Sequence, residues 1–97
     1  MEQITKIKQF LDSSGKIAQL PQKQKIRYAL LEYLSEKFEL DRTYSEQEIN
    51  IICDKWHTFN DYFLLRRELI DNCLLCRERD GSRYWRVQAV PKERNQL

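Results

Sequence analysis

Residues that interrupt regular structure are scarce in this sequence. The chain of 97 residues contains two glycines and two prolines, so helices joined by short turns are expected. No apolar run approaches the roughly 20 residues of a membrane-spanning helix, and the opening MEQITKIKQFLDSS lacks the continuous apolar core of a signal peptide. We therefore expect a cytoplasmic protein without a membrane segment.

Cysteine and histidine, the usual ligands of structural zinc, are also few. The chain has three cysteines and one histidine, and an odd number of cysteines is typical of free thiols in a reducing compartment. Cys53 and His57 are four residues apart, and Cys73 and Cys76 have the spacing of a zinc knuckle. However, Cys53 falls in an apolar helical pattern, and the other two cysteines are expected in different elements. We therefore expect core packing and no metal site.

Patterns that indicate catalysis are missing as well. The single histidine has no serine or cysteine at an informative spacing, and two glycines cannot form a glycine-rich phosphate loop. The carboxylates are expected on solvated helix surfaces. We expect no enzymatic activity and no cofactor.

Neither sign of charge is in large excess, since 17 basic and 15 acidic residues give a net charge of +2. Their distribution is uneven: residues 1–30 hold six basic and two acidic residues, residues 31–61 three and eight, and residues 62–97 eight and five. Two basic ends therefore flank an acidic middle. This pattern is compatible with steering of a polyanion and equally with an unevenly charged solvated surface.

The apolar spacing predicts two helices in the first half, over residues 3–12 and from Pro21 to about Phe38. A third helix has the clearest start signal: Ser45 with Glu48 three residues later is a capping box. This helix should end near residues 56–57. A short link then leads to Thr58 or Asn60 as the cap of a fourth helix. The apolar face of that fourth helix consists of Leu65, Leu69, Ile70 and Cys73.

An Asp80-Gly81 turn between the segments LLCRER and SRYWRV predicts a β-hairpin. Two helices, a helix-turn-helix and a two-stranded wing follow the order of a winged-helix domain. We therefore predict a mainly α fold with a small β-hairpin (α+β), in a single winged helix-turn-helix-like domain over residues 1–90. Residues 91–97 form a polar tail.

The two adjacent arginines of the fourth helix have different predicted roles. Arg66 falls in the apolar arc, so we expect it to bury its stem and pair with Glu48 or Asp61. Arg67 should point outward, on a face that also carries Asp71 and Glu68. Two acids beside one arginine make this helix a poor reader of a DNA groove.

The hairpin carries the main binding hypothesis. A two-residue turn pairs Arg77 with Tyr84 and Leu75 with Arg86, which places Arg77, Arg79, Tyr84 and Arg86 on the predicted solvent face. The predicted core face consists of Leu74, Cys76, Trp85 and Val87. A cationic surface with an aromatic ring is suited to phosphate and base contacts. A charged edge hairpin that only prevents aggregation is an equal alternative.

Three blocks of the sequence, YSEQEIN (residues 44–50), DYFLLRRELID (residues 61–71) and GSRY (residues 81–84), resemble a bacterial family, the domain of unknown function 2087. Its members carry Y-[ST]-E-x-E-[VI]-N, then D-x-x-x-L-R-R-x-L-[VI]-D, then a short wing ending in G-x-x-Y. The matching positions here are Tyr44, Ser45, Glu46, Glu48, Ile49 and Asn50; Asp61, Leu65, Arg66, Arg67, Leu69, Ile70 and Asp71; and Gly81 and Tyr84. Members occur alone or fused to DNA-binding regulators and acetyltransferases, which implies a winged-helix-like regulatory module. Where the family usually has glycine after the fourth helix, this chain has Cys73.

From these patterns we expect a nonenzymatic bacterial regulatory module that binds nucleic acid weakly. The expected contact residues are Arg67, Arg77, Arg79, Tyr84 and Arg86, together with Lys23, Lys25 and Arg27 in the second helix. The alternative is a protein-interaction or dimerisation module that has the same shape and does not contact DNA. One continuous basic face joining the second helix to the hairpin would favour nucleic acid. An exposed apolar patch around Tyr62, Phe63 and Leu64 would favour a protein partner.

Overall fold

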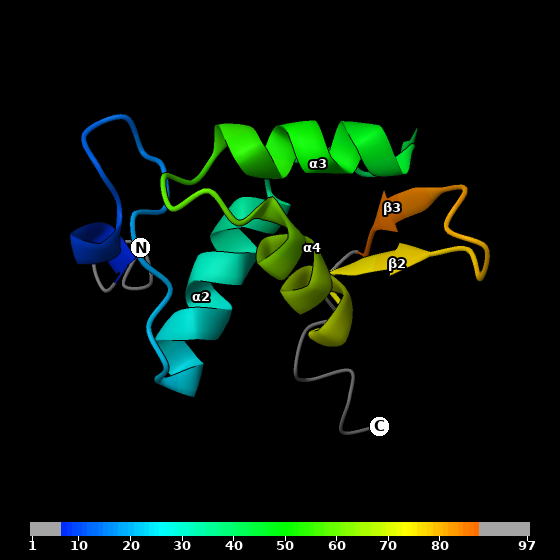
Figure 1. Ribbon diagram of the computed structural model, residues 1–97. Helices are drawn as coiled ribbons and strands as arrows, with labels where there is room; N and C mark the ends of the chain where they lie inside the picture. The colour runs from blue at the N-terminus through cyan, green and yellow to red at the C-terminus, as the bar shows by residue number, and fades with distance from the viewer. Residues whose placement is uncertain (1–6, 88–97) are drawn as a thin grey trace, which may run out of the picture.

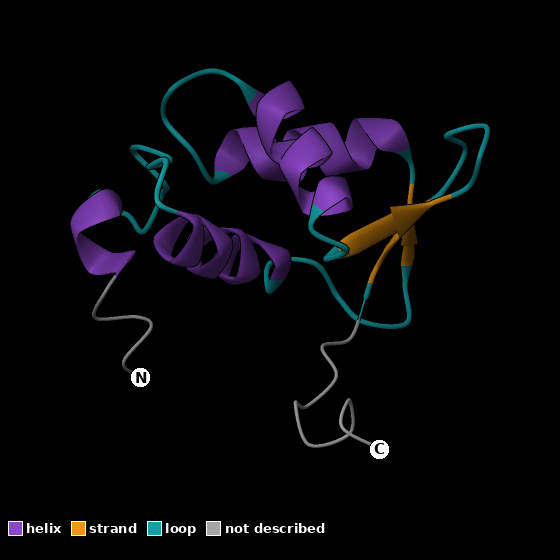
Figure 2. Ribbon diagram, turned by 90° about the horizontal axis from the view of Figure 1, so that it is seen from below, coloured by secondary structure: helices purple, strands orange, loops and turns teal. Residues whose placement is uncertain are grey.

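The computed structural model describes residues 7–87 (Figure 1). Three helices and a three-stranded antiparallel sheet form a mainly helical α+β fold, as predicted, with an element order compatible with a winged-helix shape. The elements are a 3-10 turn η1 (Lys8–Phe10), α2 (Gln24–Ser35), β1 (Thr43–Tyr44), α3 (Glu46–Lys55), α4 (Tyr62–Asp71), β2 (Leu75–Arg77) and β3 (Tyr84–Arg86). In Figures 1 and 2, α4 lies between α2 and the β2–β3 hairpin. The predicted tail and the boundary at residue 90 lie outside the described residues.

The helix predicted over residues 3–12 ends earlier than expected. Among its described residues, Ile7 is α-helical and Lys8–Phe10 form the 3-10 turn η1, but the chain is extended at Leu11. The extended piece that follows pairs with the link between α3 and α4. The amide of Ile17 donates to the carbonyl of Trp56 (2.8 Å), and the amide of Thr58 donates to the carbonyl of Ile17 (3.0 Å). The side chain of Ile17 is fully buried, so this segment closes one end of the core.

Helix α2 is shorter than the predicted span from Pro21 to Phe38. It begins after Lys23, whose backbone is extended, and ends at Ser35. Beyond it, the amides of Lys37 and Phe38 donate to carbonyls three residues earlier, which tightens the chain into turns. These turns carry Phe38 into the core, where it is almost fully buried.

Helix α3 begins where the capping box predicted. The amide of Glu48 donates to Ser45 Oγ (3.1 Å), and the amide of Ser45 donates to Glu48 Oε1 (2.8 Å). The helix ends at Lys55 with Trp56 as its C-cap, which also confirms the predicted end. Both ends are therefore determined by residues close in the sequence.

Replacing Ser45 with alanine should lower the free energy of unfolding by about 1 kcal/mol, because the amide of Glu48 loses its acceptor. Chemical denaturation would measure the change. Ser13→Ala, at an exposed position outside the helices, is the matched control and should change stability by less than about 0.5 kcal/mol. Equal effects of the two substitutions would contradict a role for the cap.

Helix α4 is capped by Asp61, and the predicted caps Thr58 and Asn60 are wrong. The amide of Leu64 donates to Asp61 Oδ1 (3.1 Å), while Asn60 has a left-handed backbone (φ 56°) and lies before the cap. At the other end, Cys73 also has a left-handed backbone (φ 61°). The amides of Cys73 and Leu74 donate back into α4, to the carbonyls of residues 70 and 69 (3.0 and 2.9 Å), as in a Schellman motif. Cys73 is exposed, so its predicted place on the apolar face is also wrong.

Cys73→Gly should raise the free energy of unfolding by about 1 kcal/mol, because glycine adopts the left-handed conformation without a Cβ penalty. Thermal or chemical denaturation would measure the gain. Cys73→Ala removes the thiol but keeps Cβ, so its effect should be close to zero. If alanine stabilised the protein as much as glycine does, backbone strain would not be the cause.

The core lies where α2, α3, α4 and the sheet meet. Its fully buried apolar side chains include Leu30, Leu31, Leu34, Ile49, Leu65, Leu69 and Leu75. Lys37, which follows α2, adds a contact to the end of α3, since its Nζ lies 4.4 Å from the ring centre of Tyr33 and 4.2 Å from that of Trp56. The predicted apolar faces of α3 and α4 are confirmed at Ile49, Leu65 and Leu69.

The hairpin register is confirmed, but its predicted faces are wrong. Leu75 pairs with Arg86 and Arg77 with Tyr84, and the strand β1 pairs with β3 on its other side, which the sequence analysis did not predict. Leu75 and Tyr84 are buried, and the side chain of Arg86 reaches the carbonyl of Phe38 (3.2 Å). Tyr84 and Arg86 are therefore not solvent-facing contact residues. The strand face that carries them packs on the core through Leu75 and Tyr84, and Arg86 can lie there because the long stem of an arginine is apolar.

Candidate functional site

A cleft of about 310 Å³ lies between α4, the start of α3 and the β2–β3 hairpin. We call it the α4–hairpin cleft. Its lining residues come from four elements: Glu46, Phe63, Arg66, Arg67, Ile70, Asp71, Arg77 and Tyr84. Three arginines and two carboxylates thus surround a partly apolar surface, at the position where the predicted helix-turn-helix meets its wing.

Arg66 forms a fixed wall of the cleft. Its side chain is 15% exposed, its Nη1 donates to Asn50 Oδ1 (2.7 Å), and the same nitrogen lies 3.4 Å from a Glu46 carboxylate oxygen. The guanidinium also lies 5.0 Å from the ring centre of Phe63. The predicted burial of Arg66 on the inner side of α4 is confirmed.

The predicted partners of Arg66, however, are wrong. The carboxylate of Glu48 accepts from the amide of Ser45, and that of Asp61 accepts from the amide of Leu64. Both acids therefore serve the starts of their own helices. Glu46 and Asn50 take their place because they lie on the side of α3 that faces α4.

Two aromatic side chains of the first turn of α4 are exposed beside this wall. Phe63 is 55% exposed and Tyr62 is 40% exposed, whereas Leu64 is half-buried. Large exposed aromatic side chains next to arginine are typical of protein interfaces. Two of the three residues named as a possible apolar patch are thus accessible, and one of them, Phe63, lines the α4–hairpin cleft.

The other two arginines of the cleft are only weakly engaged. Arg67 is 69% exposed, and its nearest carboxylate is that of Asp71 at 3.9 Å. Arg77 is exposed, and its Nη1 makes long contacts with the carbonyl oxygens of Glu78 (3.5 Å) and Arg79 (3.4 Å). Within residues 7–87, no carboxylate lies within 4.0 Å of Arg77.

The remaining arginines of the hairpin differ in exposure and in their partners. Arg79 is exposed at the turn, and Arg83 pairs with Glu78 (3.2 Å). Arg86 is half-buried, and its Nε is buried without a hydrogen-bond partner. Of the nominated hairpin residues, only Arg77 and Arg79 are therefore exposed cations.

The basic residues of α2 do not extend this surface. Lys23 and Lys25 are exposed, but Arg27 pairs with Glu68 of α4 (3.1 Å) and donates to the carbonyl of Pro21 (3.2 Å). In both ribbon views the start of α2 lies apart from the tip of the hairpin, with α4 between them (Figures 1 and 2). The structure therefore does not join the nominated basic residues into one continuous face.

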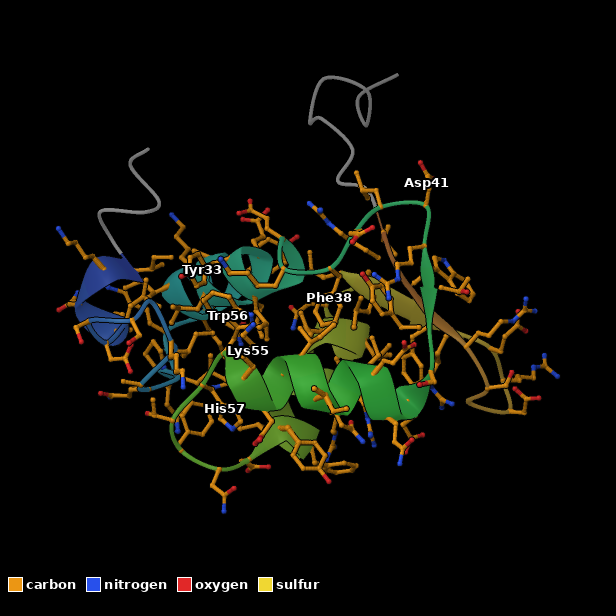
Figure 3. The ribbon with its side chains drawn as sticks, turned by 90° about the horizontal axis from the view of Figure 1, so that it is seen from above. Tyr33, Phe38, Asp41, Lys55, Trp56 and His57 are labelled. Atoms are coloured by element: carbon orange, nitrogen blue, oxygen red, sulfur yellow. The ribbon has the colours of Figure 1, made fainter. Side chains whose placement is uncertain are left out.

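His57 and Cys53 are buried, and their contacts are within the fold. Figure 3 labels His57 where the chain leaves α3. The amide of Asp61 donates to His57 Nε2 (2.6 Å), so Nδ1 carries the proton and donates to the carbonyl of Cys53 (2.7 Å). Burial raises the pKa of the Cys53 thiol to about 12. Among residues 7–87, no three histidine, cysteine or acidic side chains are grouped as a metal site.

Sequence reasoning missed Glu46, which lines the cleft, and Asn50, which holds Arg66 there. Glu46 and Asn50 are four residues apart on α3, which indicates a shared face. The sequence gives no means of deciding that Arg66, sixteen residues beyond Asn50, contacts that face.

The fold and the cleft define a small mainly helical α+β domain with a charged cleft beside its hairpin. Residues 16–86 match a family described as an uncharacterized protein conserved in bacteria (DUF2087), and the chain belongs to this family. No curated protein and no solved structure matches the chain. Within the described residues, no helix is long and apolar enough to cross a membrane.

Proposed function

We propose that this domain is a nonenzymatic bacterial regulatory module, acting in the cytoplasm, that recognises a protein partner through the first turn of α4 and the α4–hairpin cleft. The observation that carries the proposal is the exposure of Tyr62 and Phe63 beside Arg66. An aromatic ring held next to a fixed arginine supplies large apolar contact area at low entropic cost.

The charges of the same surface support a protein partner over nucleic acid. Arg66 and Arg67 each have a carboxylate nearby, on Glu46 and Asp71 respectively. Carboxylates on this surface would repel the successive phosphates of a nucleic acid backbone. A protein interface tolerates them, because its own charges can be complementary.

Nucleic-acid binding is the second candidate, and one observation favours it. Arg77 and Arg79 are exposed on the hairpin, and among the described residues neither pairs with a carboxylate. Two such arginines would give weak binding that is independent of sequence and falls steeply with salt.

Selection from a random peptide library on the immobilised domain would test the first proposal. Selected peptides should lose binding to the Tyr62→Ser/Phe63→Ser variant and keep binding to Ile51→Ser, the matched control. Ile51 is 66% exposed on α3 and does not line the cleft. Sedimentation of the free domain would show whether a second copy is the partner.

Binding to random duplex and single-stranded DNA and RNA, titrated with salt, would test the second candidate. The absence of any peptide that depends on Tyr62 and Phe63 would overturn the first proposal, and nucleic-acid binding that weakens in Arg77→Gln/Arg79→Gln would then support the second. Peptides that depend on the two aromatic residues, with no nucleic-acid binding at low salt, would overturn the second.

A further inference from the structure

We infer that the α4–hairpin cleft takes an acidic, partly apolar peptide segment of the partner, with a carboxylate between Arg67 and Arg77 and an apolar side chain against Phe63 and Ile70. This inference rests on the proposed protein-interaction function and names the chemistry of the partner. It follows from which charges in the cleft are already satisfied and which are not.

The unsatisfied positive charge of the cleft belongs to Arg67 and Arg77. The lining has five charged side chains. Arg66 is held by Glu46 and Asn50, so one arginine and one acid of the five are already paired with each other. Arg67 Nε lies 3.9 Å from Asp71 Oδ2. Both side chains are largely exposed, so this ion pair contributes at most about 1 kcal/mol. Three arginines against two acids leave a net charge of +1, located on the α4 and β2 sides of the cleft.

The geometry favours an anion that enters between two elements. Arg67 comes from α4 and Arg77 from β2, and both line the same cleft. Arg77 makes only long contacts with carbonyl oxygens of its own turn, at 3.4 and 3.5 Å. A carboxylate would replace these contacts with shorter, charge-assisted hydrogen bonds.

The rest of the cleft suits an apolar side chain. Phe63 is exposed at one side, Ile70 is half-buried two turns further along α4, and the ring of Tyr84 is buried. A volume of about 310 Å³ is at the small end of ligand sites, enough for one or two side chains of a peptide.

A single carboxylate fits this cleft better than a phosphate backbone does. The carboxylate of Glu46 is 52% exposed at one edge, and Asp71 lies at another. A chain of phosphates would have to pass these acids, whereas one acidic residue flanked by apolar ones would not.

Fluorescence anisotropy with labelled peptides would test the inference on the full chain. The probes are eight-residue peptides with a Glu-Phe-Asp-Leu core in four permuted orders, and the same peptides with Gln and Asn in place of the acids. At least one acidic peptide should bind about ten-fold more tightly than its amide counterpart, as charge-assisted hydrogen bonds predict. Binding of a random duplex DNA that carries the same label is measured in parallel.

Variants assign the binding to the cleft. Arg67→Gln and Arg77→Gln should each weaken the acidic peptide about five-fold or more, and Arg79→Gln, an exposed hairpin arginine outside the lining, should leave it unchanged. Asp71→Asn should strengthen binding about two- to three-fold, because it frees Arg67. Circular dichroism would verify that each variant is folded.

The inference is overturned if no acidic peptide binds, if acidic and amide peptides bind alike, if Asp71→Asn weakens binding, or if Arg79→Gln acts like Arg77→Gln. It is also overturned if DNA occupies the cleft with the same dependence on Arg67 and Arg77. Selected peptides that need Phe63 but carry no acid would leave the proposed function standing while this inference fails. The absence of any peptide that depends on Tyr62 and Phe63 would instead remove the proposed function itself.

Discussion

Replacing His57 with alanine is expected to lower the free energy of unfolding by about 3 kcal/mol. The buried imidazole joins the end of α3 to the start of α4, between the carbonyl of Cys53 and the amide of Asp61. The amide of Asp61 loses its acceptor, and a buried backbone group without a partner costs about 1–3 kcal/mol. The carbonyl of Cys53 keeps only the amide of Trp56 as a donor (3.2 Å), and the edge contact of the ring with Phe59 is lost as well. Chemical denaturation would measure the loss.

His57→Gln is the matched variant, since its amide can donate at one end and accept at the other. It should retain part of the stability that alanine loses. Hydrogen exchange at the amide of Asp61 should become faster in His57→Ala, because that amide loses its acceptor. A loss below about 1 kcal/mol for alanine would show that the two hydrogen bonds do not stabilise the link.

Replacing Arg66 with alanine is expected to cost about 2–3 kcal/mol. The substitution removes a largely buried stem, a 2.7 Å hydrogen bond to Asn50 and an ion pair with Glu46. The carboxylate of Glu46 is half-exposed and remains hydrated, so the larger penalty of a buried unpaired carboxylate does not apply. Thermal and chemical denaturation would both report the change.

Arg67→Ala, at the adjacent and exposed position, is the control and should cost less than about 0.5 kcal/mol. Arg66→Lys keeps the charge but loses the planar donor geometry, so it should lie between the alanine variant and the native protein. If Arg67→Ala destabilised the protein as much as Arg66→Ala, the assignment of the two arginines to inner and outer sides of α4 would be wrong.

The features that the sequence determined by itself all depend on residues close together in the chain. The capping box of Ser45 and Glu48, the end of α3 and the register of the hairpin around Asp80 and Gly81 are examples. Helical periodicity also placed Arg66 on the inner side of α4. Each depends on hydrogen bonds or side-chain spacing within a few residues, which composition and order specify directly.

The start of α4 shows where local signals fail. Thr58 and Asn60 are good caps by residue type, but the amide of Thr58 pairs with Ile17, some forty residues earlier in the chain. Asn60 has a left-handed backbone, which an N-cap residue does not adopt, so the cap is Asp61, whose amide His57 holds. A contact distant in sequence therefore chose among several locally acceptable caps.

The tertiary structure alone decided which side of the hairpin faces the core and which charges remain available. Both faces of the hairpin mix apolar and charged residues, so the alternation of residue types could not show which face is buried. The burial of Tyr84 and the pairing of β3 with β1 determine that face in the folded structure. Arg27 was nominated for binding but pairs with Glu68, 41 residues away, and Arg66 pairs with Glu46 across two helices. Ion pairs form between whichever side chains the packed helices bring together. Their partners, and with them the two arginines left available in the α4–hairpin cleft, are therefore set only once the core has formed.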